Sequence, residues 1–274
     1  MVQYCSLEVG LLASIVFLSS MVLVRPGPRP KTGSDSLREV RSSCKNPSKQ
    51  FIGLKNINEK DKQLLLNKHN KYREKVAAGK EPPQPKAENM ILLTWDSDAA
   101  LQAKAWASGC DYGHNNPEIK KTKKPMGQNI YMKSSTENGG LEKTFKKYIP
   151  EMVKGWYDEV KLYTFGDAFS VKTGHFTQIV WKNTTKVGCG YVYFKERTDY
   201  QWFRGYLVCN YSPAGNMEGE EPYKEGRGTC TGNLVASTKY PHLCQKKKEI
   251  IIKKLGLFKQ IFSYQILFYL TKIY

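Results

Sequence analysis

Apolar residues follow a helical period in two stretches of the first half of the chain. The first stretch starts at Asn58, a good N-cap residue with Asp61 three positions later, and ends at Gly79. Within it, the apolar face carries Leu65, His69, Tyr72 and Val76. His69 is therefore expected to pack inside the protein rather than to take part in chemistry. A second, Ala-rich helix is predicted from Asp96 to about Gly109.

A third helix and three strands are predicted in the second half of the chain. The helix is expected to start near Pro150, and its buried stripe comprises Met152, Val153, Trp156 and Val160. Strands are predicted at residues 176–181, 187–195 and 202–211, which are rich in apolar and aromatic residues. Because helices come first and an antiparallel meander follows, the order of elements predicts an α+β fold.

The last two predicted strands flank a polar stretch, residues 196–200, and therefore form a hairpin. If the hairpin is centred on Asp199, residues whose numbers sum to 398 face each other, and Cys189 then faces Cys209. Facing residues lie about 4.5 to 5.5 Å apart between Cα atoms, a separation that a disulfide accepts. The pattern predicts a bridge between these two strands.

The N-terminal sequence and the cysteine count indicate an exported protein. Residues 9–24 form an uncharged apolar run of 16 residues, shorter than a membrane span of about 20 residues. We expect residues 1–24 to be a signal peptide, with a retained signal anchor as the alternative. Cleavage would remove Cys5 and leave six cysteines, an even set that predicts three disulfides in an exported chain. Six cysteines allow about 15 pairings, so spacing alone does not choose among them.

Positive charge is concentrated at the two ends of the chain. The net charge is +18, of which residues 25–49 carry +5 and residues 245–274 carry +6. Residues 25–49 are rich in Pro, Arg, Ser and Gly, which predicts a flexible basic arm. Residues 1–24 carry −1 and residues 50–244 carry only +8, and the latter contain no nucleic-acid-binding motif. We therefore expect no nucleic-acid partner.

The C-terminal tail, residues 245–274, is both basic and apolar, and two hypotheses account for it. One is a basic helix that touches a membrane and is anchored by Lys246–Lys248. The other is a translated non-coding stretch that is not part of the native protein, because AT-rich codons encode mostly Lys, Ile, Phe, Tyr and Leu. The second is favoured, since residues such as Leu255 and Leu257 make opposite helical faces apolar and leave no polar face.

Seven sequence blocks occur in one order between about residues 45 and 235. They are HNKYR at residue 69, CDYGH at 110, GQNIYM at 127, WYDE at 156, GHFTQIVW at 174, YLVCNYSPAGN at 206 and PYKEG at 222. The set resembles the signatures of the CAP superfamily, which includes cysteine-rich secretory proteins, plant pathogenesis-related proteins, insect venom allergens and helminth venom allergen-like proteins. The chain looks most similar to the last of these groups.

This resemblance implies a fold, a domain organisation and a disulfide pattern. The fold is a three-layer α-β-α sandwich with a central antiparallel sheet. A CAP domain would cover residues 50–218, and a disulfide-stapled C-terminal extension would cover residues 219–244. The resemblance pairs Cys189 with Cys209, and it further implies bridges that join Cys44 to Cys110 and Cys230 to Cys244.

The resemblance also implies a cleft lined by two histidines and two acids. Carried onto this chain, these positions are His114, Gln128, Glu159 and His175, so that a Gln stands where the family usually has a Glu. Zinc accepts imidazole and carboxylate ligands, so His114, His175 and Glu159 form a candidate site for a weakly bound divalent metal. Gln cannot act as a general base, and no nucleophile motif occurs, so we expect no enzymatic activity. A purely structural role for the four residues is the competing interpretation.

A segment rich in aromatic residues precedes the GHF block. Its members are Trp156, Tyr157, Tyr163, Phe165 and Phe169. Some family members bind sterols or fatty acids through apolar loops in this region, so the resemblance implies lipid binding by these residues. The competing interpretation is that they fill the core, because large aromatic side chains dominate protein interiors.

Taken together, these features predict a secreted, non-enzymatic protein that binds a lipid, a sterol or a host-cell receptor at a parasite–host boundary. Two alternatives stay open. One is a metal-dependent hydrolase that uses His114, Glu159 and His175, and the other is a receptor ligand without a small molecule. Asn183 in the triplet NTT is predicted to carry a glycan, whereas Asn210 in NYS is the poorer acceptor because it lies inside a predicted strand.

Overall fold

A computed structural model describes residues 40, 42–198 and 200–247 of the chain. The predicted signal peptide, most of the basic arm and the tail from residue 248 onward lie outside these residues. Among the described residues, no helix is both long and apolar enough to cross a membrane.

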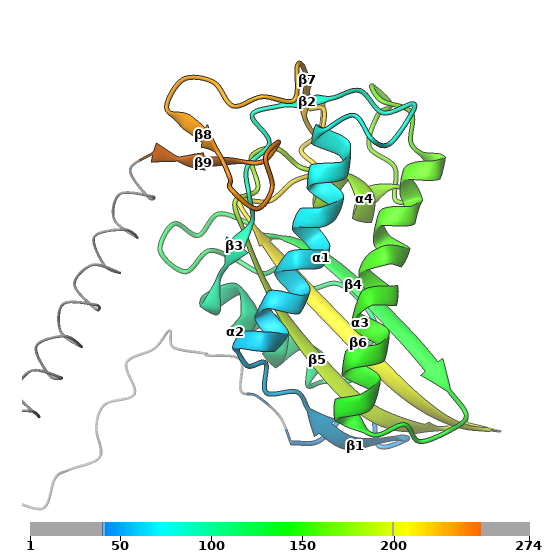
Figure 1. The fold of residues 1–274 in the computed structure, drawn as a ribbon. Coiled ribbons are helices and arrows are strands. Elements are labelled where there is room, and N and C mark those ends of the chain that lie inside the picture. The colour runs from blue at the N-terminus through cyan, green and yellow to red at the C-terminus, as the bar shows by residue number, and fades with distance from the viewer. Residues whose placement is uncertain (1–39, 41, 199, 248–274) are drawn as a thin grey trace, which may run out of the picture. The chain divides into compact units, whose positions relative to one another are not determined.

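A central sheet organises the described part of the chain (Figure 1). Its strands run in the order β1-β5-β6-β4, each antiparallel to its neighbour, and β3 adds a short parallel pairing to β5. The bounds are Lys49–Leu54 for β1, Thr94–Trp95 for β3, Gly127–Ser135 for β4, Lys186–Arg197 for β5 and Gln201–Ser212 for β6. Strands β5 and β6 confirm the predicted hairpin, whereas β1 and β4 were not predicted.

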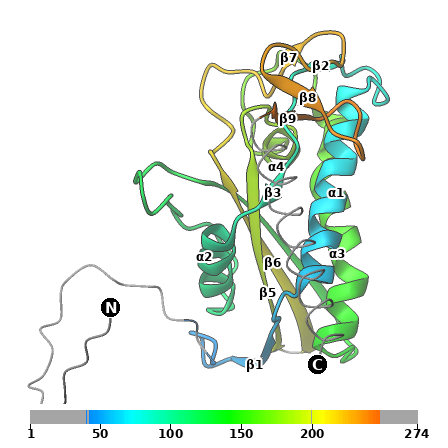
Figure 2. The same ribbon diagram turned by 60° about the vertical axis from the view of Figure 1, so that its left-hand side comes forward.

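Helices cover both faces of this sheet. Helix α2, Ser97–Ala107, lies on one face, while α1, Glu59–Ala77, and α3, Leu141–Asp158, lie on the other (Figure 2). A short 3-10 helix, η1 at Glu159–Leu162, follows α3, and α4 at Gly174–Ile179 comes before the hairpin. The arrangement confirms the expected α-β-α sandwich with its antiparallel centre.

The first two helices begin where the sequence predicts. Asn58 and Asp61 form a reciprocal capping box at the start of α1, in which each side chain accepts from the other residue's main-chain N–H. Asp96 caps α2 by accepting from the N–H groups of Asp98 and Ala99. Short polar side chains therefore define both starts, because they satisfy main-chain donors that have no partner inside the helix.

Two predicted elements are wrong. Helix α3 begins at Leu141 rather than near Pro150, which lies inside it. Proline interrupts one helical hydrogen bond, but Phe145, Tyr148 and Ile149 upstream of it are all buried, and this packing extends the helix across the proline. The predicted strand at residues 176–181 is instead the helix α4, since a short continuous apolar run does not distinguish a buried strand from a buried helix.

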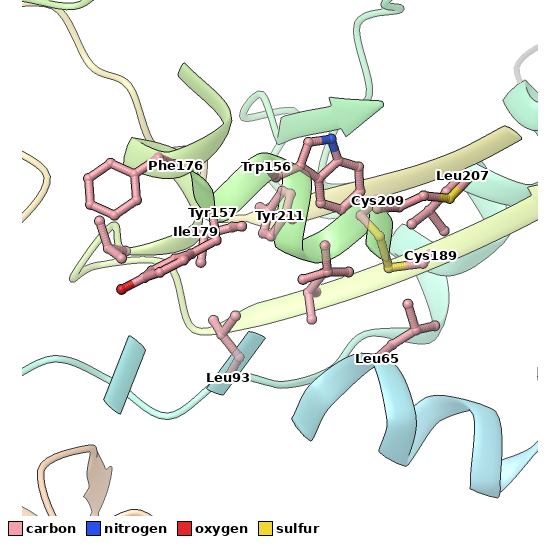
Figure 3. Close-up of a cluster of buried hydrophobic side chains, with 14 of the residues drawn as sticks. Leu65, Leu93, Trp156, Tyr157, Phe176, Ile179, Cys189, Leu207, Cys209 and Tyr211 are labelled. Atoms are coloured by element: carbon pink, nitrogen blue, oxygen red, sulfur yellow. A yellow bond between two sulfur atoms is a disulfide. The ribbon is translucent and has the colours of Figure 1, made fainter. Parts of the chain in front are cut away.

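The main core lies between the sheet and the α1 and α3 layer. Figure 3 shows side chains from these elements around the Cys189–Cys209 bridge, which joins β5 to β6. The hairpin register pairs these two cysteines as predicted, with Cα atoms 4.1 Å apart. The other two bridges, Cys44–Cys110 and Cys230–Cys244, also match the pairing that the resemblance implied.

His69 and Arg73 of the HNKYR block lie on α1, and each makes buried hydrogen bonds to other segments of the domain. The ring nitrogen Nδ1 of His69 lies 2.8 Å from the carbonyl oxygen of Leu65, and Nε2 lies 2.8 Å from the hydroxyl of Tyr211. A carbonyl oxygen can only accept, so Nδ1 carries the proton and Nε2 accepts from Tyr211. Burial lowers the pKa of His69 to about 4, and the charge of Arg73 acts in the same direction.

Arg73 is fully buried and binds main-chain carbonyl groups rather than a carboxylate. Its guanidinium donates to Ile91, Ile179, Trp181 and Thr184, at distances from 2.5 to 3.4 Å. Burial lowers its pKa to about 9. The side chain thereby ties α1 to the segment before β3 and to the turn that follows α4.

The C-terminal extension contributes to two small sheets, of which the first attaches it to the domain and the second lies within the C-terminal part itself. Strand β2, Ala87–Glu88, pairs with β7, Lys224–Glu225, and β8, Leu234–Ala236, pairs with β9, Cys244–Lys246. The main-chain N–H of His242 donates to the carboxylate of Glu74 on α1, and the Cys230–Cys244 bridge closes the last loop. These contacts hold the extension against α1.

Candidate functional site

His175 and Glu159 form a hydrogen-bonded pair at the start of α4. Glu159 follows α3 directly, and His175 is the second residue of α4. One carboxylate oxygen of Glu159 lies 2.6 Å from Nδ1 of His175, while the other accepts from the N–H groups of His175 and Phe176, at 2.9 and 3.1 Å. Glu159 therefore caps α4 and orients the imidazole with a single side chain.

Neighbouring residues hold His175 in place from two further sides. Its ring stacks on Trp156, with centroids 6.1 Å apart and planes 23° from parallel. Its carbonyl oxygen accepts from the side-chain amide of Asn129 on β4, at 3.1 Å. The His175 side chain remains 26% exposed and that of Glu159 19% exposed, so solvent or a ligand can reach the pair.

His114 has a different partner, the amide of Gln128 at the start of β4. The Gln128 oxygen lies 3.0 Å from Nδ1 of His114 and accepts from the main-chain N–H of Asn115, at 3.2 Å. The Gln128 nitrogen donates to the side-chain oxygens of Asn115 and Asn210, at 2.6 and 2.9 Å. The Gln128 amide therefore accepts hydrogen bonds through its oxygen and donates them through its nitrogen. A carboxylate at this position would have no N–H to donate. Gln128 thus fits its surroundings as a neutral group.

The start of β4 links the two histidines. Gln128 binds the His114 ring, and the next residue, Asn129, binds the carbonyl of His175. The structure therefore gathers all four residues implied by the resemblance around one strand end, as two separate pairs.

The donors at this site fit a divalent metal poorly. Both Nδ1 atoms are engaged, to Gln128 and to Glu159, so each histidine offers only Nε2. Zinc in proteins usually takes three or four protein ligands. In the part of the chain that the structure describes, no three His, Cys, Asp or Glu side chains come together to hold an ion.

Most of the aromatic segment lies inside the protein. Trp156, Tyr157 and Tyr163 are buried, and Phe165 is half-buried against Tyr223. Phe169 is 56% exposed. These positions agree with core filling for four of the five residues and leave Phe169 at the surface.

Two exposed apolar residues of the same region were not predicted. Leu162 is 66% exposed and Val171 is 82% exposed, and both lie between α3 and α4. Met217, 47% exposed, follows Asn216, whose side chain donates to the carbonyl of Gly174. Single apolar residues in a polar context carry little signal in a sequence, so only the fold shows that these side chains are exposed.

Comparison with known proteins places the chain in a family. The model of the CAP, or cysteine-rich secretory protein, family matches residues 66–211. Salivary antigen-5 of Triatoma infestans is 46% identical over 226 residues, which cover 78% of this chain and 92% of that protein. Venom allergen 5 of Vespula flavopilosa is 38% identical and covers 68% of this chain and 93% of its own length.

Solved structures give the same result. BmVAL-1 superposes with a TM-score of 0.55 at 26% identity and covers 70% of this chain and 97% of its own. NaASP2, solved with Zn²⁺, has a TM-score of 0.51 at 28% identity and covers 69% of this chain and 97% of its own. The seven blocks, the sandwich, the paired histidines and these relatives agree, and the chain belongs to the cysteine-rich secretory protein, or CAP, family.

Proposed function

We propose that this CAP protein is exported and acts by binding an apolar ligand, a lipid or a sterol, at the exposed loop of residues 162–171. Three disulfides fit an oxidising extracellular environment, and the relatives named as salivary and venom proteins support export. Asn183 is exposed in the turn before β5, in keeping with its predicted glycan, whereas Asn210 is fully buried.

The observation that carries this proposal is a set of exposed apolar side chains in the segment between α3 and α4, which leads up to His175 in the chain. Leu162, Phe169 and Val171 expose more than half of their surface, which is unusual for large apolar residues that lie close together in the chain. The Phe169 ring packs at the start of α4, where a Cβ atom on Gly174 would lie 3.2 Å from it. A lipid bound there would cover apolar surface that otherwise faces water, and each side chain would contribute about 1.5 to 3 kcal/mol if fully buried.

Binding fits the chemistry of the site better than hydrolysis does. Glu159 already accepts three hydrogen bonds, from the His175 ring and from two main-chain donors, so its carboxylate acts as a helix cap. Gln128 cannot exchange a proton with His114. All six described cysteines are in disulfides and offer no thiol nucleophile. A metal-dependent hydrolase built on His114, Glu159 and His175 is therefore the less supported alternative.

A protein receptor on the cell of another organism is a second candidate partner. The names of the relatives, salivary antigen-5 and venom allergen 5, favour it because they place those proteins in secretions. The same exposed loop would then supply the contact, and no small molecule would be needed.

Competitive binding of cholesterol and palmitate to protein made in an exporting host tests the proposal. The double variant Phe169→Ser with Val171→Ser is expected to lose at least about tenfold in affinity. Ile52→Ser, which changes a residue 38% exposed on β1, is the matched control and is expected to bind as the wild type does. Wild-type protein that retains neither lipid, yet cross-links to a cell-surface protein through the loop, would replace the first candidate by the second.

A further inference from the structure

A pocket of about 200 Å³ lies where α2, the segment before α1 and the edge of β5 meet. It contains none of the loop residues 162–171 and none of the four cleft residues. Helix α2 and strand β5 lie side by side in both views (Figures 1 and 2).

The pocket exists because strand β5 has a gap along one edge. Strand β1 pairs with β5 at residues 192–196, and β3 pairs with it at residues 186–187. No strand pairs with residues 188–191 on this side in the described part of the chain. Gly190 also lines the pocket, at the point where the backbone of α2 packs closely on the strand. A Cβ atom at Gly190 would lie 2.4 Å from the Cα of Lys104, so a larger residue is excluded.

Main-chain groups of Cys189 face this gap. On either side of it, the carbonyl of Val187 accepts from the N–H of Asp96, and the carbonyl of Tyr191 accepts from the N–H of Lys55. Because hydrogen-bonding directions alternate along a strand, the N–H and carbonyl of Cys189 point to the same edge. The 4.1 Å separation of the Cys189 and Cys209 Cα atoms agrees, since it is typical of a facing pair without ladder hydrogen bonds. The N–H of Cys189 thereby points into the gap, where no described strand pairs with it.

The lining of the pocket is positively charged. It includes Lys55, Lys62 and Lys104 and no acidic residue. Lys55 is almost fully buried, and its charge is balanced by Asp61 and Glu142, at 2.9 and 2.8 Å. Among the described residues, Lys62 pairs with Glu59 alone, and because Glu59 is highly exposed this contact contributes little in water. Lys104 has no ion-pair partner among the described residues, so the pocket carries uncompensated positive charge.

The remaining wall of the pocket is apolar, with a few free polar groups. Trp95, Ile57, Ala100 and Leu101 supply the apolar surface. Neither the indole N–H of Trp95 nor the hydroxyl of Ser97 has a hydrogen-bond partner among the described residues. Free donors, two lysines and an apolar wall together suit an anion that carries a short hydrocarbon body.

We propose that this pocket binds a small amphiphilic carboxylate. The carboxylate would lie between Lys62 and Lys104 and accept from the N–H of Cys189, while the hydrocarbon body would pack on Trp95 and Leu101. Drug-sized ligands occupy pockets of about 300 to 1,000 Å³, so a cavity of about 200 Å³ suits a smaller molecule. This site is separate from the proposed lipid-binding loop and does not depend on it.

Calorimetric titration with hexanoate tests the assignment. Hexanol, which lacks the negative charge, and inorganic phosphate, which lacks the hydrocarbon body, are the comparison probes. Wild-type protein is expected to bind hexanoate at least about tenfold more tightly than either probe, with affinity falling as salt rises. Lys104→Met, which keeps the hydrocarbon stem but removes the charge, is expected to weaken hexanoate binding about tenfold or more. The control Lys146→Met removes an exposed lysine of α3 and should leave the affinity unchanged.

A second variant keeps the charges and fills the space. Ala100→Leu is expected to abolish hexanoate binding while the melting temperature changes little, because Ala100 lines the pocket and is only half-buried. Equal affinities for hexanol and hexanoate, or full binding by Lys104→Met or Ala100→Leu, would overturn the assignment. The loop variant Phe169→Ser with Val171→Ser should retain wild-type hexanoate affinity, so the two proposals succeed or fail separately.

Discussion

Histidine has a different role in the buried HNKYR block than in the two surface pairs, His114 with Gln128 and His175 with Glu159. His69 and Arg73 are fully buried and make hydrogen bonds only to groups inside the protein. His114 and His175 each bind one partner through Nδ1 and keep Nε2 available at the surface. A histidine in a family signature is therefore no evidence of chemistry by itself, because its environment decides whether it supports the fold or meets a ligand.

The two surface pairs differ from each other as well. His175 is held by a carboxylate that also caps a helix, whereas His114 is held by an amide within a neutral network of asparagines. A carboxylate raises the basicity of an imidazole more than an amide does. Substitutions in the buried HNKYR block and in the two surface pairs should therefore differ in their effects, from a large loss of stability at Arg73 to a change in metal affinity at Gln128.

The largest effect is expected at Arg73. Arg73→Met leaves the carbonyls of four residues without their donor and should lower the free energy of unfolding by about 4 kcal/mol or more. Arg73→Lys, with three donors in place of five, should lose roughly 2 to 3 kcal/mol. Urea unfolding with the disulfides intact measures both. If Arg73→Met lowers the free energy of unfolding by less than about 1 kcal/mol, water has taken over the hydrogen bonds that the guanidinium donates.

The next effect is a pH dependence that comes from His69. Its pKa is about 4 in the folded protein and about 6.5 when unfolded, so the unfolded state binds a proton more readily. Stability from this group is present above pH 6.5 and is lost as the pH falls toward about 4, by about 3 kcal/mol in total. His69→Gln should remove this part of the acid sensitivity, measured as unfolding free energy from pH 7.5 to 4. Identical pH profiles for the two proteins would contradict it.

A smaller loss of stability is expected at the first surface pair. Glu159→Ala removes the cap of α4 and should lower the free energy of unfolding by about 2 kcal/mol, while Glu159→Gln keeps one acceptor and should lose about half of that. Asp158→Ala is the matched control, because in the part of the chain that the structure describes this neighbouring acid forms its ion pair with Lys154 on the surface, and its loss should change stability by less than about 0.5 kcal/mol. Equal losses of unfolding free energy in Glu159→Ala and Asp158→Ala would show that capping of α4 by Glu159 does not stabilise the protein.

The smallest effect is expected at the second pair and concerns metal affinity. Gln128→Glu gives His114 a carboxylate partner, as His175 already has, and should tighten zinc binding about tenfold. Asn115 can accommodate the change, because its side-chain nitrogen is buried without a partner and can turn toward the new carboxylate. Gln63→Glu adds the same charge on the exposed side of α1 and serves as the control in calorimetric titrations with zinc. Unchanged zinc affinity would mean that His114 is not a ligand.

Much of the local structure was predictable because its causes are local in the chain. Asn58 and Asp96 mark helix starts through side chains that bind main-chain groups two or three residues away. The position of the turn fixes the register of the hairpin, and the register alone places Cys189 opposite Cys209. The four cleft residues came from the family resemblance, and the structure brings them to one strand end.

The mistaken and missed elements depend on contacts far apart in the sequence. Helix α4 forms where Glu159 caps residues 175 and 176 and where Arg73 takes up the carbonyl of Ile179. Strand β1 exists because its residues pair with β5, more than a hundred positions away. Neither partner is visible in the segment itself, so its own pattern could not decide between helix, strand and loop.

The sequence by itself determined the family, the starts of α1 and α2, the hairpin and its disulfide, because each depends on a motif or on neighbours along the chain. Only the tertiary structure decided that most of the aromatic segment is buried, that Gln128 sits in a neutral amide network, and that β5 leaves a positively charged gap at its edge. These features arise from packing between distant segments, and packing assigns burial, charge environment and free hydrogen-bonding groups that no single stretch of residues encodes.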